Sequence, residues 1–222
     1  NNQHHPESPG AIWKQVIHLK RTFEAALESS ALQQMAKRLR ERALVLTVSG
    51  TTGGAKSLTI AKAVLAEQRP TAVIVPSNSE AQSLARELEF YFNLLSEKQI
   101  DLIHMPALEV DPYRGLSPHP DISAARAKAI WRLLQDGMKV LVVSIQAAAV
   151  RLHKPERFLN YCLTFKTGEE MSPDIIREYL FESGYAEDDP VTEPGEFSLR
   201  GGILDIFAQH MENPIRLEFF GD

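Results

Sequence analysis

The chain has 222 residues, of which 44% are hydrophobic and 24% are charged, and its formal net charge at pH 7 is −5. This composition is typical of a globular protein and excludes the disordered, collagen-like and coiled-coil classes. No apolar run approaches the roughly 18 residues of a membrane helix, and residues 1–10 lack the apolar segment of a signal peptide. The single cysteine, Cys162, cannot form an internal disulfide, which favours a reducing, cytoplasmic location.

Up to residue 150 the sequence alternates between helical and strand patterns. Apolar periodicity predicts helices at 12–27, 31–40, from 57, 79–95 and 121–135, and apolar runs predict strands at 43–48, 71–75, 100–104 and 139–143. Ser79 with Gln82 is expected to open one helix as a capping box, and Asp121 to cap another. Near-continuous apolar strands that alternate with helices predict a parallel sheet covered on both faces, as in nucleotide-binding α/β domains.

After residue 150 the pattern changes. Ser172 and Pro173 predict the start of a helix, and Gly184 predicts its end. Short strands are predicted at 163–166, 189–193, 197–199, 203–208 and 215–220. We therefore expect one helix packed against a small antiparallel sheet. The organisation predicted from these patterns is a tail at residues 1–11, an α/β domain at 12–150 and a small α+β module at 151–222.

Charge is divided unevenly between these two parts. Residues 1–150 hold 17 Lys/Arg and 14 Asp/Glu, whereas residues 151–222 hold 7 and 15, a net charge of −8. Phosphate contacts supply most of the non-specific affinity for nucleic acids, so an acidic module is a poor DNA-binding element. It is compatible either with a protein partner or with a surface that merely maintains solubility.

Residues 50–57 read G-T-T-G-G-A-K-S between a predicted strand and a predicted helix, the position of a phosphate-binding loop. The loop pattern has a second glycine where this chain has alanine, and the added Cβ opposes close approach of the backbone to a phosphate. No acidic residue follows a predicted strand to hold magnesium. We favour a degenerate loop that serves strand-to-helix packing, and a working nucleotide site remains the alternative. The residues concerned are Gly50, Gly53, Gly54, Ala55, Lys56 and Ser57.

The seven histidines lack metal-ligand spacing, and Cys162 has no CxxC partner. No Gly-x-Ser-x-Gly turn is present. The sequence therefore predicts no metal site and no catalytic residues.

Two stretches carry a family resemblance. Residues 116–122 read L-S-P-H-P-D-I, and residues 195–207 read G-E-F-S-L-R-G-G-I-L-D-I-F, followed by I-R-L-E-F-F-G-D at 215–222. Together they resemble the amino-terminal region of the bacterial transcription-repair coupling factors (Mfd), which is itself similar to the excision-repair protein UvrB. The altered phosphate loop and the short segment 105–121, which contains one tyrosine, favour Mfd over UvrB.

The resemblance implies a RecA-like domain without ATPase function at residues 12–150 and a module that binds UvrA at residues 151–222. It implies that the motor domains, which use ATP and magnesium, and the regions that contact RNA polymerase and duplex DNA lie outside this chain. The fragment itself is then expected to be non-catalytic, monomeric and without a cofactor. The alternative is a UvrB-like, nucleotide-dependent DNA-binding repair enzyme with a working loop.

Matching positions also imply a contact set for UvrA, in which Arg200 corresponds to the arginine before glycine that reaches UvrA. UvrB has arginines at the positions of Ser198 and Glu187, so this chain departs from that pattern. Strand alternation places Ser198 on the side of Arg200 and Phe197 on the opposite side, so we expect Phe197 to serve the core more than the contact. The pair Gly201-Gly202 predicts a tight turn or a bulge. The candidate set is Glu187, Glu196, Phe197, Ser198 and Arg200.

Overall fold

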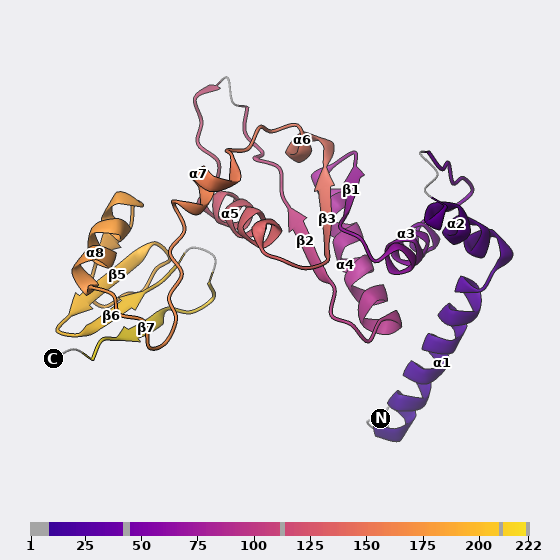
Figure 1. The fold of residues 1–222 in the computed structure, drawn as a ribbon, viewed down its shortest axis with the longest axis horizontal. Coiled ribbons are helices and arrows are strands. Elements are labelled where there is room, and N and C mark those ends of the chain that lie inside the picture. The colour runs from indigo at the N-terminus through magenta and orange to yellow at the C-terminus, as the bar shows by residue number, and fades with distance from the viewer. Residues whose placement is uncertain (1–8, 42–44, 112–113, 209–210, 221–222) are drawn as a thin grey trace, which may run out of the picture. The chain divides into compact units, whose positions relative to one another are not determined.

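The computed structural model describes residues 9–41, 45–111, 114–208 and 211–220 (Figure 1). The chain divides into two compact units, one formed by residues 1–107 and 135–149 and the other by residues 108–134 and 150–222. Within the described ranges no helix combines the length and the apolar character needed to cross a membrane.

The first unit contains a three-stranded parallel sheet in the order β1-β3-β2, which confirms the parallel arrangement expected from the apolar runs. Its core is formed where α4 packs against α3 and β3, with Leu88, Val140 and Val142 fully buried. Its elements are α1 (Pro9–Leu27), α2 (Ser30–Arg40), α3 (Gly54–Glu67), β1 (Thr71–Val75), α4 (Asn78–Leu95), β2 (Asp101–Met105), β3 (Lys139–Ser144) and α6 (Ile145–Ala148).

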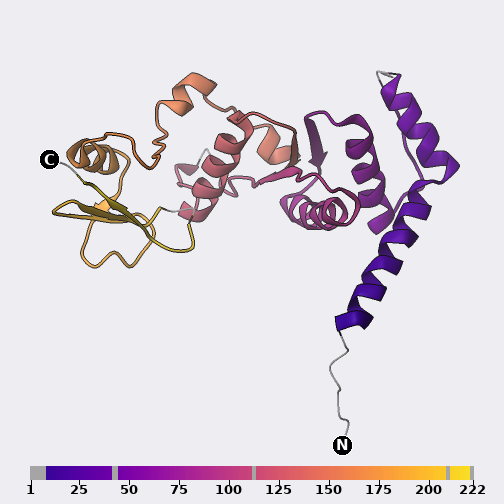
Figure 2. The same ribbon diagram turned by 60° about the horizontal axis from the view of Figure 1, so that its bottom comes forward.

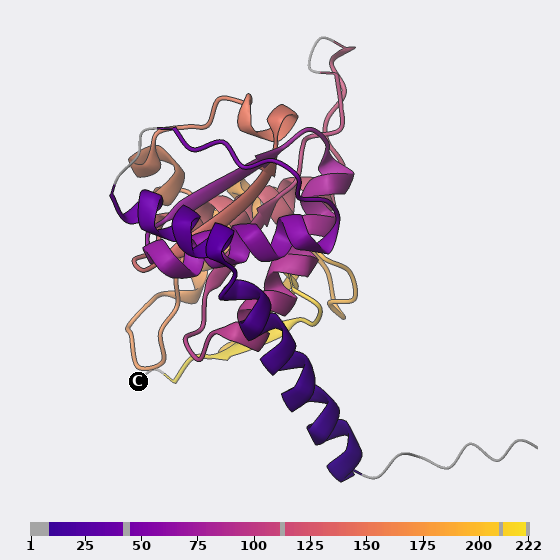
Figure 3. The same ribbon diagram turned by 90° about the vertical axis from the view of Figure 1, so that its right-hand side faces the viewer.

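Helix α1 is anchored to this unit near its carboxyl-terminal end. The ring of Phe23 meets those of Tyr91 and Phe90 of α4 edge to face, with centroids 5.3 and 6.4 Å apart. Figure 3 shows the amino-terminal half of α1 projecting away from the rest of the unit. The expected tail, residues 1–11, lies largely outside the described residues, and α1 already begins at Pro9.

The strand predicted at 43–48 was wrong for residues 45–48, which have no regular structure; residues 43 and 44 lie outside the described residues. Val45 is 84% exposed. Strand β3 lies between β1 and β2 and is hydrogen-bonded along both of its edges, so the central place in the sheet is already filled. Residues 45–48 pair with no strand of this sheet and are mostly exposed, so they gain neither the hydrogen bonds nor the burial that stabilise a strand.

The capping residues also differ from the prediction. Helix α4 is capped by Ser77, two residues before the expected Ser79, and the Ser77 hydroxyl accepts a hydrogen bond from the Glu80 amide at 3.2 Å. Ser77 and Glu80 also have the Ser-x-x-Glu spacing, so the sequence contains two overlapping capping-box patterns, and the helix begins at the first of them. In α5 (Pro120–Leu134) Asp121 lies in the first turn, and its amide donates to His119 Nδ1 at 3.3 Å.

The second unit contains a four-stranded sheet in the order β4-β5-β6-β7, with α8 on one face (Figure 2). Strands β5, β6 and β7 are antiparallel, but β4 pairs parallel to β5, so the sheet is mixed and not antiparallel throughout as we expected. Ile176 and Leu180 of α8 pack with Phe197, Leu204 and Ile206. Besides α5, the elements are α7 (Pro155–Leu159), α8 (Pro173–Glu182), β4 (Ala186–Glu187), β5 (Glu196–Arg200), β6 (Ile203–Ile206) and β7 (Ile215–Glu218).

Two further predicted strands were wrong. Residues 163–166 are irregular, and Phe165 is the member of that run that packs against the core. Residues 189–193 are also irregular, because Pro190 has no amide to donate and the Glu196 carboxylate accepts the amides of Thr192 and Glu193 at 2.8 Å, which turns the chain. The strand of this region is instead β4, at residues 186–187.

The predicted end of α8 was confirmed. Gly184 has a φ of +85°, its amide donates to the Phe181 carbonyl at 3.0 Å, and the Tyr185 amide donates to the Leu180 carbonyl at 2.9 Å. These two bonds form the Schellman arrangement that commonly ends helices at a glycine.

The tight turn predicted at Gly201-Gly202 was also confirmed, because Arg200 and Ile203 are paired residues on either side of it. Gly201 has a φ of +57° and open space around its Cβ position. At Gly202 a Cβ would lie 2.8 Å from the carbonyl oxygen of Phe219, whose amide donates to the Gly202 carbonyl at 2.7 Å.

We expect Gly202→Ala to lower the free energy of unfolding by about 2–3 kcal/mol, because a backbone carbonyl cannot move aside for the new methyl group. Gly201→Ala, the matched control, should cost about 1 kcal/mol through its left-handed backbone alone. Urea denaturation measures both values. A larger loss for Gly201→Ala than for Gly202→Ala would contradict the close contact with Phe219.

Candidate functional site

One face of the second sheet carries polar side chains. Ser198 of β5 lies opposite Asp205 of β6, which lies opposite Arg216 of β7. Phe197 and Leu204 alternate with these residues and face α8. The alternation predicted for residues 197–200 is therefore confirmed, and the polar row lies on the face opposite the helix.

Asp205 joins two arginines on this polar face. Its carboxylate accepts from Arg216 Nε at 2.7 Å and from Arg216 Nη2 at 2.8 Å, and Arg200 Nη2 lies 3.5 Å from it. Arg200 Nη1 lies 3.0 Å from the carboxylate of Asp189. The side chain of Asp205 is 14% exposed, whereas those of Arg200 and Arg216 are 56% exposed. The guanidinium of Arg200 is thus held in a defined position while much of its surface faces solvent.

The other predicted contact residues have different surroundings. Phe197 is fully buried, and its ring meets that of Phe181 edge to face at 5.1 Å. Ser198 lies on the polar face but is 4% exposed. Phe197 can therefore meet a partner only if the core of the module opens, and Ser198 presents little surface.

Glu187 and Glu196 make contacts within the module. Glu187 pairs with Arg177 of α8 through contacts of 2.6 and 3.1 Å, so it lies on the helix side of the sheet and not beside Arg200. The guanidinium of Arg177 also lies over the ring of Phe181, 5.5 Å from its centroid. The amides of Thr192 and Glu193, which donate to Glu196, lower the pKa of its carboxyl group.

Sequence reasoning missed Asp189, Asp205 and Arg216. Asp205 could have been found, because a two-residue turn after Arg200 places Asp205 on the same sheet face by strand alternation. Arg216 requires the β6–β7 register, and Asp189 lies in the segment that we predicted as a strand.

The second candidate site, the Gly50–Ser57 loop, leads into α3. Gly50 and Gly53 have φ angles of +81° and +51°, which glycine adopts readily. The Ala55 amide donates to the Thr52 carbonyl at 3.2 Å, and the Lys56 amide donates to the Gly53 carbonyl at 3.0 Å. Two amides at the position of a phosphate cradle are thus already bonded to carbonyls of the loop itself.

An acidic residue of α4, Glu87, contacts this loop. The hydroxyl of Ser57, which is 2% exposed, donates to the carboxylate of Glu87, and Ser83 Oγ donates to the other Glu87 oxygen at 3.4 Å. The Tyr91 hydroxyl donates to the Gly54 carbonyl at 3.2 Å. Burial of Tyr91, and then the nearby charge of Glu87, raises the pKa of this phenol. Glu87 lies 30 residues from Ser57, so spacing gave no signal for the pair.

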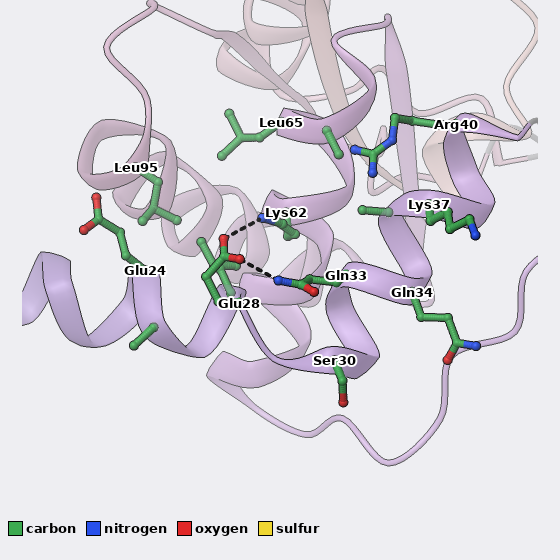
Figure 4. Close-up of a pocket in the computed structure, with 14 residues that line it drawn as sticks. Glu24, Glu28, Ser30, Gln33, Gln34, Lys37, Arg40, Lys62, Leu65 and Leu95 are labelled. Carbon is green, nitrogen blue, oxygen red and sulfur yellow. Dashed lines mark hydrogen bonds and ion pairs between the residues drawn. The ribbon is translucent and has the colours of Figure 1, made fainter.

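A third candidate is a groove of about 1110 Å³ in the first unit, lined by α1, α2, α3 and Leu95 (Figure 4). The carboxylate of Glu28 lies at its centre, where it accepts from Gln33 Nε2 at 2.6 Å and lies 3.9 Å from Lys62 Nζ. Leu65 and Leu95 add apolar surface. Among the described residues no cluster of three or more His, Cys, Asp or Glu could hold a metal ion.

Comparison with known proteins gives these features a context. Residues 163–222 match the UvrB interaction domain. The transcription-repair coupling factor of Mycobacterium tuberculosis is 33% identical over 207 residues, which cover 90% of this chain and 16% of that protein. The Escherichia coli factor is 31% identical over 172 residues, covering 77% and 14%, and UvrABC system protein B of Thermus thermophilus is 28% identical over 204 residues, covering 88% and 30%.

These findings confirm the resemblance to the coupling factors and to UvrB that the sequence indicated. The chain spans less than a third of the length of each of these relatives. The matched domain contains β5, β6 and β7, and therefore Arg200, Asp205 and Arg216.

The Asp205 network predicts a dependence of stability on pH. Its hydrogen bonds from Arg216, together with the charges of Arg216 and Arg200, lower the pKa of the Asp205 carboxyl group below its ordinary value of 3.8. The stabilisation is therefore complete above about pH 5 and is lost as the pH falls through the lowered pKa.

We expect the free energy of unfolding of the wild type to fall more steeply between about pH 5 and pH 3 than that of Asp205→Asn. Urea denaturation at a series of pH values measures both curves, with Asp174→Asn, an exposed acid of α8, as the control. Parallel wild-type and Asp205→Asn curves would show that the ionised carboxylate contributes no stability.

Proposed function

Because residues 163–222 match the UvrB interaction domain, and 90% of the chain aligns with a transcription-repair coupling factor, we propose that this chain recruits UvrA. The process would be transcription-coupled nucleotide excision repair, in the bacterial cytoplasm. The chain itself would be non-catalytic and monomeric and would need no cofactor. ATP-driven movement on DNA and contact with RNA polymerase would belong to other parts of a longer protein.

The observation that carries this proposal is the position of Arg200 within the matched domain. Its side chain is 56% exposed, yet two carboxylates hold its guanidinium on the face of the sheet opposite α8. An arginine that is already oriented loses less conformational freedom on binding than a free surface side chain. Arginine is also enriched among the residues that dominate the energy of protein interfaces.

The charge of the module supports a protein partner over DNA. Residues 151–222 carry a net charge of −8, which repels a phosphate backbone. The two arginines of the polar face, Arg200 and Arg216, are already paired with Asp189 and Asp205. Their charges are therefore partly neutralised, and these two side chains do not form the extended basic surface that binds a phosphate backbone.

The geometry of the Gly50–Ser57 loop supports the proposal that the chain does not depend on nucleotide. A serine hydroxyl beside a carboxylate is a donor pair that could hold magnesium, and this pair favours the UvrB-like enzyme as the second candidate. However, Ser57 donates directly to Glu87, and two loop amides are bonded to the loop's own carbonyls. A triphosphate would have to break these contacts and approach the charge of Glu87. We therefore favour a structural role for the loop.

We expect Arg200→Gln to weaken binding of UvrA by more than about 1 kcal/mol, because the variant removes the oriented charge at the proposed contact. Isothermal titration calorimetry with purified UvrA measures the affinity. Lys166→Gln is the matched control: it removes the same charge from a side chain of this module that is 74% exposed and pairs with Glu169. Equal affinity of wild type and Arg200→Gln would exclude Arg200 from the interface.

We expect ATP with magnesium to leave the melting temperature of the chain unchanged, because we propose that the loop binds no nucleotide. A ligand that binds the folded state would raise the melting temperature. Differential scanning fluorimetry with increasing nucleotide tests this, with a protein that has an intact phosphate loop as positive control. A saturable rise in this chain, abolished by Lys56→Ala, would favour the nucleotide-dependent enzyme.

A further inference from the structure

The two carboxylates beside Arg200 differ in how firmly they are held. Asp205 lies within β6, is 14% exposed and forms a two-contact pair with Arg216. Asp189 follows β4 in an irregular segment and is 47% exposed. Its carboxylate nevertheless makes the shorter contact with Arg200, at 3.0 Å compared with 3.5 Å for Asp205.

This difference decides which contact a partner can replace. Exposed ion pairs contribute only about 0.2–1 kcal/mol, because water and salt screen the charges and two side chains must be ordered. The Arg200–Asp189 pair, with both side chains about half exposed, belongs to this class. Displacing Asp205 would also break its two hydrogen bonds with Arg216, which makes that exchange costlier.

We propose that Asp189 occupies the place of an acidic side chain of the partner. On docking, an aspartate or glutamate of UvrA would take the place of Asp189 at Arg200 Nη1, while Asp205, kept in position by Arg216, continues to hold the guanidinium. The inference rests on the proposed function, since it names the chemistry of the partner group that this surface accepts. Asp189 thereby lowers the affinity of the free module, because its contact must be broken first.

The proposal predicts a gain of affinity on removal of a native contact, which a purely structural role would not give. Asp189→Asn keeps the shape of the side chain and removes its charge. We expect it to bind UvrA more tightly than the wild type, by up to about fivefold, the upper limit given by the strength of an exposed ion pair. If Asp189→Asn lowers the melting temperature, Asp189→Ser serves as a second variant.

Asp188→Asn is the matched control for the loss of one negative charge. Asp188 is the neighbouring residue, and its Oδ1 accepts the Asp189 amide at 2.8 Å, a bond that the asparagine oxygen can also accept. This variant leaves the pair between Asp189 and Arg200 in place, so we expect wild-type affinity.

The closing experiment is a double-mutant cycle with Asp189→Asn and Arg200→Gln, measured by calorimetry against UvrA. We expect Asp189→Asn to tighten binding in the wild-type background and to have no effect in the Arg200→Gln background. An unchanged or weaker affinity of Asp189→Asn, an equal gain with Asp188→Asn, or an equal gain without Arg200 would each overturn the inference while the proposed function stands. Wild-type affinity of Arg200→Gln, or no binding of UvrA by the wild type, would overturn both.

Discussion

The pairing of Asp205 with Arg216 and Arg200 is the interaction on which the proposed binding surface depends. It links β5, β6 and β7 on the polar face of a sheet whose other face is fixed by Phe197 and Leu204 against α8. Because side chains alternate along a strand, the packing of the apolar face also sets which residues reach the polar face. A buried core thus orients an exposed charge, and the partner need not supply that order.

The glycine-rich loop has the backbone of the phosphate-loop pattern together with contacts that join it to α4. Its glycines still adopt left-handed backbone angles at the entrance of α3. The Tyr91 hydroxyl donates to the Gly54 carbonyl of this loop, and the Ser57 hydroxyl donates to Glu87. These contacts join α3 to α4 through polar groups next to the core of the first unit. The loop contributes to packing in this way, whatever its relation to phosphate.

Local signals predicted much of the fold, whereas long-range partners decided the rest. The alternating pattern of β5 predicted that strand, and the glycine after α8 predicted the end of that helix. Both signals act within a few residues: side chains alternate along a strand, and glycine readily adopts a positive φ. The run at residues 45–48 has a strand pattern but no strand, since it neither pairs with the sheet nor is buried in the core. Arg200 was singled out from the resemblance to UvrB, and its role stays a prediction. The Ser57–Glu87 and Asp205–Arg216 contacts could not be read from spacing, because each joins separate elements whose register only the folded chain defines.

The central claim is that the oriented guanidinium of Arg200 meets UvrA directly. It is tested most directly by recording the side-chain Nε–H signals of the ¹⁵N-arginine-labelled chain while unlabelled UvrA is added in substoichiometric amounts. The account predicts that the Arg200 signal broadens or shifts first, and that the signal of Arg86, on α4 of the other unit, stays unchanged at the same ratio. An unaffected Arg200 signal in a mixture where other arginines respond would contradict it.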